Sequence, residues 1–259
     1  MFGFFDSYFL FFGLKITYYG FIIALAMVLA VIVACKNAKF RGLKSDDILL
    51  LACYIIPFSI IGARLYYVIF SPNEITSFWQ VFKIWEGGMA IYGGIIGGAL
   101  ATVLYCAIHK KNFLDVADVA VVSLVLGQAI GRIGCYFAGC CYGTEVTSPS
   151  LTWFPLSTYV HGAWHLSTFF YESICNFIVF FVFLFLLRRK VKTRGVMMSL
   201  YFICYGTIRC IIETFRGDSL YLGGIKVSQL LSALLIIAGI VLLVVLLIRK
   251  KKTQQNIEV

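Results

Sequence analysis

The chain has 259 residues, of which 61% are hydrophobic and 13% are charged, and its mean hydropathy is +0.93. Soluble domains contain about 25% charged residues, so this composition excludes a soluble globular protein and indicates an integral membrane protein. The net charge of +10 does not indicate a nucleic-acid partner, because the basic residues gather in short patches at the ends of apolar runs, as in membrane proteins.

The first segment, Met1 to Lys15, is aromatic and apolar, and we expect a short amphipathic helix lying along the membrane interface. The apolar stretch after Lys15 continues to full membrane-spanning length, so we do not expect a cleavable signal peptide.

Seven apolar runs are long enough to cross a bilayer, which takes about 20 residues per helix. They are Ile16 to Ala34, Ile48 to Phe70, Gly88 to Ile108, Val116 to Phe137, Phe169 to Leu187, Val196 to Phe215 and Val227 to Ile248. The sequence therefore predicts an all-α polytopic membrane protein whose residues 1–259 form a single transmembrane domain.

Most of the lysines and arginines follow the first, third, fifth and seventh runs. Because cytoplasmic loops are enriched in basic residues, we expect the N-terminus outside and a basic cytoplasmic tail at 249–259. The long connection at 138–167 contains no lysine or arginine, and we expect it to form an extracytoplasmic loop or head.

Three arginines, Arg64, Arg132 and Arg209, lie within apolar runs, and the predicted topology puts each in the outer part of its helix. Buried charge is costly in a membrane and usually functional, so we expect the three to converge on one anionic site. The structural alternative is a separate pairing for each arginine, and the acids available at that depth are Glu86, Glu145, Glu172 and Glu213.

Arg132 lies in the segment 127–143 with Gly127, Gly131 and Gly134 around it, so another helix or a ligand can approach its backbone. Guanidinium binds phosphate through a planar fork of donors. This segment indicates either a site for a phosphate-bearing lipid or an arginine that only pairs with a glutamate or helix-end carbonyls.

Further motifs each have a structural alternative. Gly-Gly pairs flank Tyr92 and indicate either close helix packing or a cavity. We interpret Glu172 as an acid at a helix N-terminus and Tyr19 as an interfacial anchor. His161 and His165 have the i, i+4 spacing of a helical metal pair, but no third ligand stands out. Three clustered cysteines, Cys135, Cys140 and Cys141, lack the spacing of a zinc motif, so we expect no metal.

The assembled motifs resemble the prolipoprotein diacylglyceryl transferase family along nearly the whole chain. The matching stretches are Tyr-Tyr-Gly at 18–20, Gly-Ala-Arg-Leu at 62–65, Glu-Gly-Gly…Tyr-Gly-Gly at 86–94, Gly-Arg-Ile-Gly…Ala-Gly-Cys-Cys-Tyr-Gly at 131–143, Tyr-Glu at 171–172 and Tyr-Gly-Thr-Ile-Arg…Glu-Thr-Phe-Arg-Gly-Asp at 205–218. The resemblance also covers the seven spans and the outside N-terminus.

This resemblance implies an enzyme of the bacterial cytoplasmic membrane, with its active site facing the outer leaflet. It would move the diacylglyceryl group of phosphatidylglycerol to the lipobox cysteine in a prolipoprotein signal peptide, and it would need no cofactor. The resemblance implies that Arg132 contacts the phosphatidylglycerol head group and that Arg209 is the second essential arginine, beside Glu213 and Arg216. We expect Arg132, Arg209 and Glu213 to act in catalysis. Further expected substrate-binding residues are Arg64, Tyr19, Arg216 and Gly143.

The chain departs from the family pattern at several positions. Tyr92 stands where many members have a histidine, and we expect it at the reacting centre; Cys135 and Cys140 replace Asn and Glu. Three alternative functions remain: a lipid-modifying transferase with another acceptor, an anion transporter or channel, and a seven-span receptor. Transporters often contain paired repeats, and none is visible here.

Overall fold

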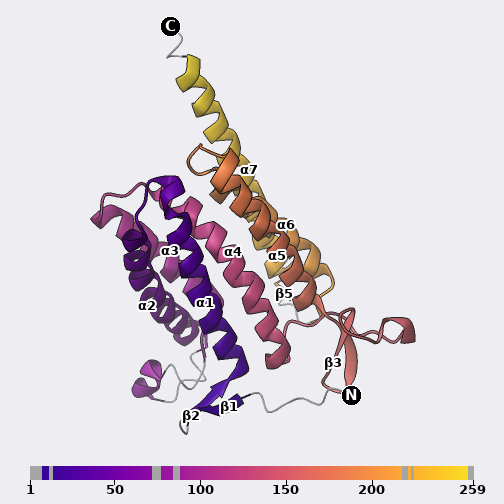
Figure 1. The fold of residues 1–259 in the computed structure, drawn as a ribbon. Helices are drawn as coiled ribbons and strands as arrows, with labels where there is room; N and C mark the ends of the chain where they lie inside the picture. Colours follow the sequence, from indigo (N-terminus) through magenta and orange to yellow (C-terminus); the bar gives the residue numbers. More distant parts are fainter. Residues whose placement is uncertain are drawn as a thin grey trace. The chain divides into compact units, whose positions relative to one another are not determined.

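The computed structural model describes residues 8–11, 14–71, 77–83, 88–217, 221–222 and 225–255. In this part of the chain, seven helices are long and apolar enough to cross a membrane, which confirms the predicted fold class. They are α1 (Tyr18–Asn37), α2 (Ser45–Phe70), α3 (Ile91–Ile108), α4 (Phe113–Ala138), α5 (Thr168–Phe185), α6 (Val196–Thr214) and α7 (Val227–Gln255) (Figure 1).

In the described ranges, the long helices are accompanied by three short antiparallel hairpins, the first of which precedes α1, and by four short helical turns. The hairpins pair β1 (Tyr8–Phe11) with β2 (Leu14–Thr17), β3 (Ser157–Val160) with β4 (Ala163–Leu166), and β5 (Tyr221–Leu222) with β6 (Ile225–Lys226). The helical turns are η1 (Ala38–Arg41), η3 (Phe78–Phe82), η5 (Pro149–Leu151) and η6 (Leu186–Lys190).

The amphipathic helix predicted for Met1 to Lys15 is wrong for the residues that the structure describes. Strands β1 and β2 form a hairpin there, and β2 leads directly into α1. Aromatic residues favour strands over helices and are frequent in this segment, and the β-branched Ile16 and Thr17 complete β2. Residues 1–7 and 12–13 lie outside the described part.

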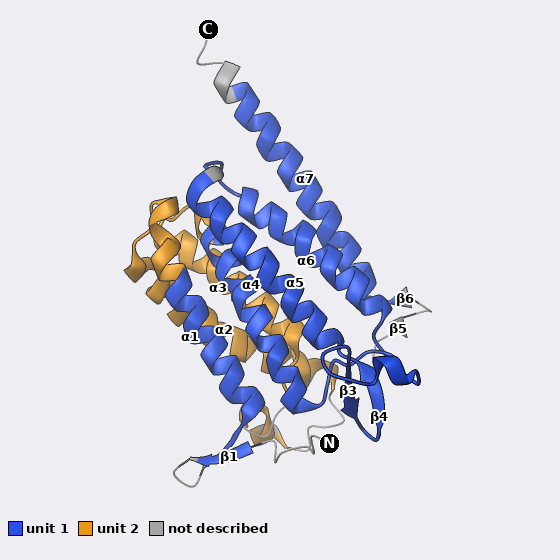
Figure 2. Ribbon diagram, turned by 45° about the vertical axis from the view of Figure 1, so that its right-hand side comes forward, with its two compact units in different colours: residues 1–33, 117–259 blue, residues 34–116 orange. Residues whose placement is uncertain are grey.

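The chain divides into two compact units (Figure 2). The larger unit contains residues 1–33 and 117–259, and the smaller contains residues 34–116.

Helix α4 forms the centre of the larger unit. Its valines Val122 and Val125 are almost completely buried, and they belong to the same hydrophobic cluster as Phe183 of α5 and Met197 of α6. Polar contacts tie the same helices together. Ser173 donates to the carbonyl of Ala129 at 2.7 Å, and the amide of Gln128 donates to the hydroxyl of Tyr201 at 2.8 Å. This packing gives α4, α5 and α6 a fixed register in which their polar side chains can meet.

Glycines allow close helix contacts in both units. These close contacts account for the glycine-rich runs of the sequence. In the larger unit, a Cβ atom added to Gly134 of α4 would lie 3.1 Å from the ring of Tyr19 in α1. In the smaller unit, a Cβ on Gly93 of α3 would overlap the carbonyl oxygen of Gly62 in α2. The packing interpretation of the Gly-Gly pairs is therefore supported by geometry.

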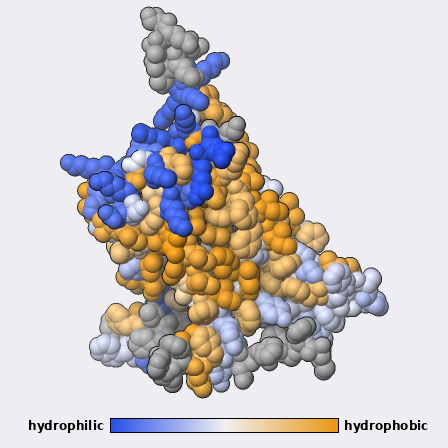
Figure 3. Space-filling model, viewed as in Figure 1, coloured by the Kyte–Doolittle hydropathy of each residue, from blue (hydrophilic) through white to orange (hydrophobic). Residues whose placement is uncertain are grey.

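The two ends of α6 meet different polar groups. The N-terminus of α6 is capped by the buried Asp118, whose carboxylate accepts from the backbone N–H of Gly195 at 2.8 Å and of Met198 at 3.0 Å. The opposite end of α6 lies at the hairpins and the arginines. In Figure 3 the hydrophilic surface at the C-terminal end of α7 contrasts with the hydrophobic surface along the helices.

Candidate active site

Three helices of the larger unit bring charged side chains to one level. Arg132 lies near the C-terminal end of α4, Glu172 lies in the first turns of α5, and Arg209 and Glu213 lie in the last turns of α6. Helix α5 runs antiparallel to α4 and α6, so the first turns of α5 lie at the level of the last turns of α4 and α6. Arginine and glutamate therefore meet between the helices rather than along one of them.

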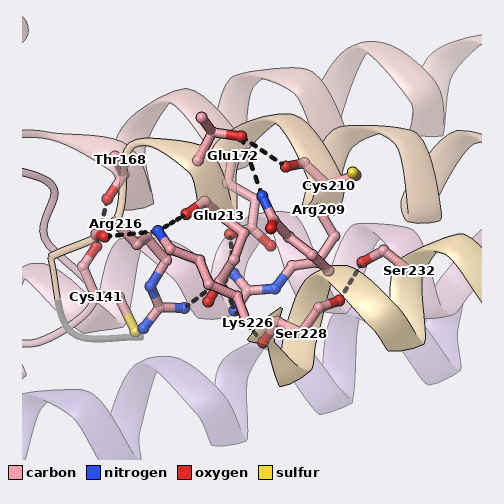
Figure 4. Close-up of polar contacts among 12 residues, drawn as sticks. Cys141, Thr168, Glu172, Arg209, Cys210, Glu213, Arg216, Lys226, Ser228 and Ser232 are labelled. Carbon is pink, nitrogen blue, oxygen red and sulfur yellow. Dashed lines mark hydrogen bonds and ion pairs between the residues drawn. The ribbon is translucent and has the colours of Figure 1, made fainter. Parts of the chain in front are cut away.

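Glu172 is the centre of the resulting network. One carboxylate oxygen, Oε1, lies 2.9 Å from Nη2 of Arg132, and the other, Oε2, accepts from Nη1 of Arg209 at 3.2 Å. Arg209 also reaches Glu213 on its own helix, with Nη2 2.8 Å from Oε2 (Figure 4). A single carboxylate thus joins arginines from two helices.

The network continues past the end of α6. Nη1 of Arg216 lies 3.9 Å from Oε2 of Glu213, and Nζ of Lys226 donates to the carbonyls of Glu213 at 2.7 Å and Arg216 at 3.2 Å. These carbonyls are at the negative end of the helix dipole, where a cation is stabilising. Lys226 therefore holds the turn that carries Arg216.

The carboxylates of this network are deeply buried and the arginines are partly exposed. The side chains of Glu172 and Glu213 are each 2% exposed, whereas that of Arg132 is 18% exposed. Buried charges are tolerated only when they are paired and hydrogen-bonded. Each of the three arginines accordingly lies within 4.0 Å of Glu172 or Glu213.

A backbone junction positions the loop next to the arginines. The N–H of Gly143 donates to the carbonyl of Leu166 at 2.8 Å, and the N–H of Thr144 donates to that of Phe215 at 2.9 Å. A Cβ on Gly143 would lie within 3.0 Å of Leu166, Thr168 and the carbonyl of Phe215. Only glycine fits this crossing, so Gly143 has a structural role beside the site.

Cys141 contacts the same arginine cluster from the loop. Nη1 of Arg132 donates to its Sγ at 3.4 Å. Hydrogen bonds from the thiols of Cys135 and Cys140, together with the positive charges of Arg132 and Arg216, lower the pKa of the Cys141 thiol below its usual range. The three cysteines that cluster in the sequence also lie together in space, because the Sγ atoms of Cys135, Cys140 and Cys141 are all within 4.8 Å of one another.

Two of the predicted site residues belong to the smaller unit. The guanidinium of Arg64 donates to the backbone carbonyls of Gln80 at 2.5 Å, Val81 at 3.0 Å and Gly88 at 2.9 Å. Tyr92 begins α3 and its ring lies 6.2 Å from that of Tyr66. The structure therefore brings Arg132 and Arg209 together at Glu172, whereas Arg64 donates to backbone carbonyls within its own unit.

Two sequence interpretations need correction. Glu172 is an ion-pair partner of two arginines, not merely a helix N-terminal acid, and the signal that pointed to it was the arginines at matching depth. His161 and His165 are not one turn apart on a helix, because both lie in the β3–β4 hairpin, with His161 at its turn (φ 50°). Glu86, another candidate acid, lies outside the described residues.

Seven apolar helices and a buried arginine–carboxylate network near one end of three of them define a multi-pass membrane protein with a polar, anion-suited site. The family model of prolipoprotein diacylglyceryl transferase matches residues 7–245. The chain therefore belongs to this family of bacterial membrane transferases.

Named relatives cover most of the chain. It is 40% identical over 228 residues to phosphatidylglycerol–prolipoprotein diacylglyceryl transferase 1 of Clostridium perfringens, covering 86% of this chain and 87% of the relative. It is 41% identical over 230 residues to phosphatidylglycerol–prolipoprotein diacylglyceryl transferase of Clostridium botulinum (strain Loch Maree / Type A3), covering 87% of this chain and 90% of the relative. The enzyme of Finegoldia magna is 36% identical over 228 residues, covering 88% and 90%.

Proposed function

We propose that this protein transfers the diacylglyceryl group of phosphatidylglycerol to the lipobox cysteine of a prolipoprotein. A thioether forms, and glycerol phosphate leaves. Family membership and the names of the relatives support this reaction. The structural observation that carries the proposal is the sharing of Glu172 by Arg132 and Arg209, which holds two guanidinium groups side by side in a buried setting.

The arginines act on the phosphate of the lipid. As the carbon–oxygen bond of phosphatidylglycerol breaks, negative charge grows on the departing phosphate. Guanidinium groups fixed in advance in a low-dielectric site stabilise that charge without having to reorganise, and their planar forks suit phosphate oxygens. Glu172 and Glu213 hold Arg132 and Arg209 in place, so that binding the lipid does not require ordering long side chains.

Further residues have proposed roles. Arg216 adds positive charge next to Glu213, and Gly143 allows the loop to cross beside it. We assign Tyr19 and Arg64 to lipid binding because their motifs match the family. We assign Tyr92 to the reacting centre because it stands where many members have a histidine. The active site faces the outer leaflet, since the basic clusters that mark the cytoplasmic side lie at the other ends of α4 and α6.

Reconstitution in lipid vesicles tests the function directly. The purified protein is placed in vesicles that contain phosphatidylglycerol, with a synthetic lipobox peptide carrying one cysteine. We expect a mass increase of one diacylglyceryl group on the peptide, and none when the cysteine is replaced by serine or when the vesicles contain only phosphatidylethanolamine.

Variants connect the activity to the arginine network. Arg132→Ala should lower the lipidation rate by about a hundredfold or more, as loss of a charge-stabilising donor does. Lys251→Ala, an exposed lysine of α7, is the matched control and should leave the rate unchanged. Consumption of lipid with an unmodified peptide would indicate a different acceptor, and anion flux without lipid consumption would indicate a transporter.

A further inference from the structure

Three thiols gather beside Arg132, although the sequence spacing gave no zinc motif. The Sγ atoms of Cys135, Cys140 and Cys141 all lie within 4.8 Å of one another, and the three cysteines are free thiols. Cys135 is buried near the end of α4, and the other two follow that helix. Among the described residues, this is the group of metal-ligating side chains that comes close enough together to hold an ion.

The backbone brings the thiols together through a defined helix end. The N–H of Cys140 donates to the carbonyl of Cys135 at 3.2 Å, and that of Gly139 donates to Tyr136 at 3.3 Å, with Gly139 in the left-handed region (φ 59°). This is the Schellman arrangement that closes a helix. It turns the chain back, so that Cys140 returns to the level of Cys135.

Cys141 completes the turn in an uncommon conformation. Its φ of 60° lies in the left-handed region that residues with a Cβ seldom occupy. The hydroxyl of Thr168 in α5 donates to its carbonyl at 2.8 Å and fixes this conformation. The side chain of Cys141 is thereby held toward Arg132 and the other two thiols.

We propose that Cys135, Cys140 and Cys141 bind one zinc ion as three thiolates, with a fourth coordination position open to a thiol. Thiolate ligands favour zinc or Cu(I), and three protein ligands with an open position are typical of catalytic rather than structural zinc. Zinc–sulfur bonds of about 2.3 Å place tetrahedral ligands roughly 3.8 Å apart, so side-chain shifts of about 1 Å or less complete the site.

Charge and position support zinc at this place. Three thiolates and Zn²⁺ have a net charge of −1, and a cation borders the site, because Nη1 of Arg132 lies 3.4 Å from Sγ of Cys141. An iron–sulfur cluster would ordinarily need four cysteines. The three-thiolate site therefore suits a single ion next to the phosphate-binding arginines.

The role of this zinc rests on the proposed transfer reaction. The acceptor cysteine takes the open position and loses its proton to solvent on coordination, because a metal-bound thiol is deprotonated. Its sulfur then forms a bond to the glycerol carbon of phosphatidylglycerol, the carbon–oxygen bond breaks, and the electron pair leaves with the phosphate. Zinc would in this way supply the thiolate in a chain that has Tyr92 in place of the family histidine.

Metal analysis of the full-length protein in detergent is the first test. We expect about one zinc per chain by mass spectrometry of the metal, and protection of the three thiols from alkylation until a chelator is added. Cys141→Ser should lose the zinc, whereas Cys53→Ser, an exposed cysteine of α2, should retain it. Zinc-free wild-type protein with three reactive thiols, or with a disulfide among them, would overturn the proposal.

Activity separates this proposal from the proposed function. Removing zinc with a chelator should lower peptide lipidation by about a hundredfold, in the range of lost proton-transfer catalysis, and added zinc should restore it. Lipidation that persists without zinc would reject the role of zinc and leave the transferase function standing. Zinc binding without any lipidation would support the metal site and reject the transferase function.

Discussion

Nη2 of Arg132 lies 2.9 Å from Oε1 of Glu172, and this contact joins α4 to α5 at the centre of the charged network. Glu172 is 2% exposed and also pairs with Arg209 of α6. Its carboxylate is therefore both a structural connection among three helices and the group that orients the arginines of the proposed lipid site.

Replacing Glu172 with glutamine should be strongly destabilising. The change leaves two partly buried guanidinium groups without their shared anion, and breaking a buried pair costs about 3–5 kcal/mol. Thermal unfolding in detergent should show a large decrease in the melting temperature, and lipidation should be lost. Glu145→Gln, an exposed glutamate in the loop, is the control and should behave like the wild type. Unchanged stability of Glu172→Gln would show that the network contributes little.

Arg209→Lys tests whether the planar fork matters more than the charge. Arg209 contacts Glu172 through Nη1 and Glu213 through Nη2, and a lysine ammonium cannot hold both in this geometry. We expect the lipidation rate to fall by about a hundredfold, with a smaller change in stability. Arg189→Lys, at an exposed arginine of η6, should retain full activity. A rate near that of the wild type in Arg209→Lys would mean that charge alone suffices.

Gly143→Ala should destabilise the junction beside Arg216. The new Cβ would collide with Leu166, Thr168 and the carbonyl of Phe215, and overpacking costs about 1–3 kcal/mol. Unfolding by heat or denaturant would measure this loss. Gly127→Ala provides the comparison. Its new Cβ would lie 3.9 Å from the Cβ of Ala30, which is an ordinary contact, and Gly127 lies in the interior of α4. That variant should be neutral or slightly stabilised.

The low pKa of Cys141 predicts a distinct pH profile in metal-free protein. Alkylation consumes the thiolate. A thiol with a lowered pKa remains a thiolate at lower pH, so the alkylation rate of Cys141 should not fall at pH values where ordinary thiols react slowly. Cys135→Ala removes the largest cause of the shift, a hydrogen bond to Cys141. The pKa should then rise and the rate at neutral pH should fall. Mass spectrometry of the labelled peptide measures the rate, with Cys175→Ala as the control. Equal profiles in both variants would contradict the assignment.

Much of the fold follows from patterns that are local in sequence. Apart from α7, which continues past the predicted Ile248 to Gln255, the seven long apolar helices begin and end within a few residues of the predicted runs, because length and hydropathy alone decide whether a helix can cross a bilayer. The N-terminal hairpin was missed, since short apolar and aromatic segments do not distinguish an interfacial helix from a strand.

The charged site was predicted in part. The depth of Arg132 and Arg209 followed from the topology, and the structure brings both to Glu172. The roles of all the predicted site residues stay predictions, namely those of Arg132, Arg209, Glu213, Tyr92, Arg64, Tyr19, Arg216 and Gly143. The thiol cluster could not be predicted, because a left-handed turn at Gly139 and Cys141, rather than residue spacing, decides that the sulfurs meet.

The sequence by itself determined the membrane fold, the number of spans and the family, because hydropathy and ordered motifs are written along one dimension. Only the tertiary structure decided which carboxylate each arginine meets and that three cysteines share one place. Those contacts depend on the relative register of α4, α5 and α6, and side-chain packing between the helices sets that register.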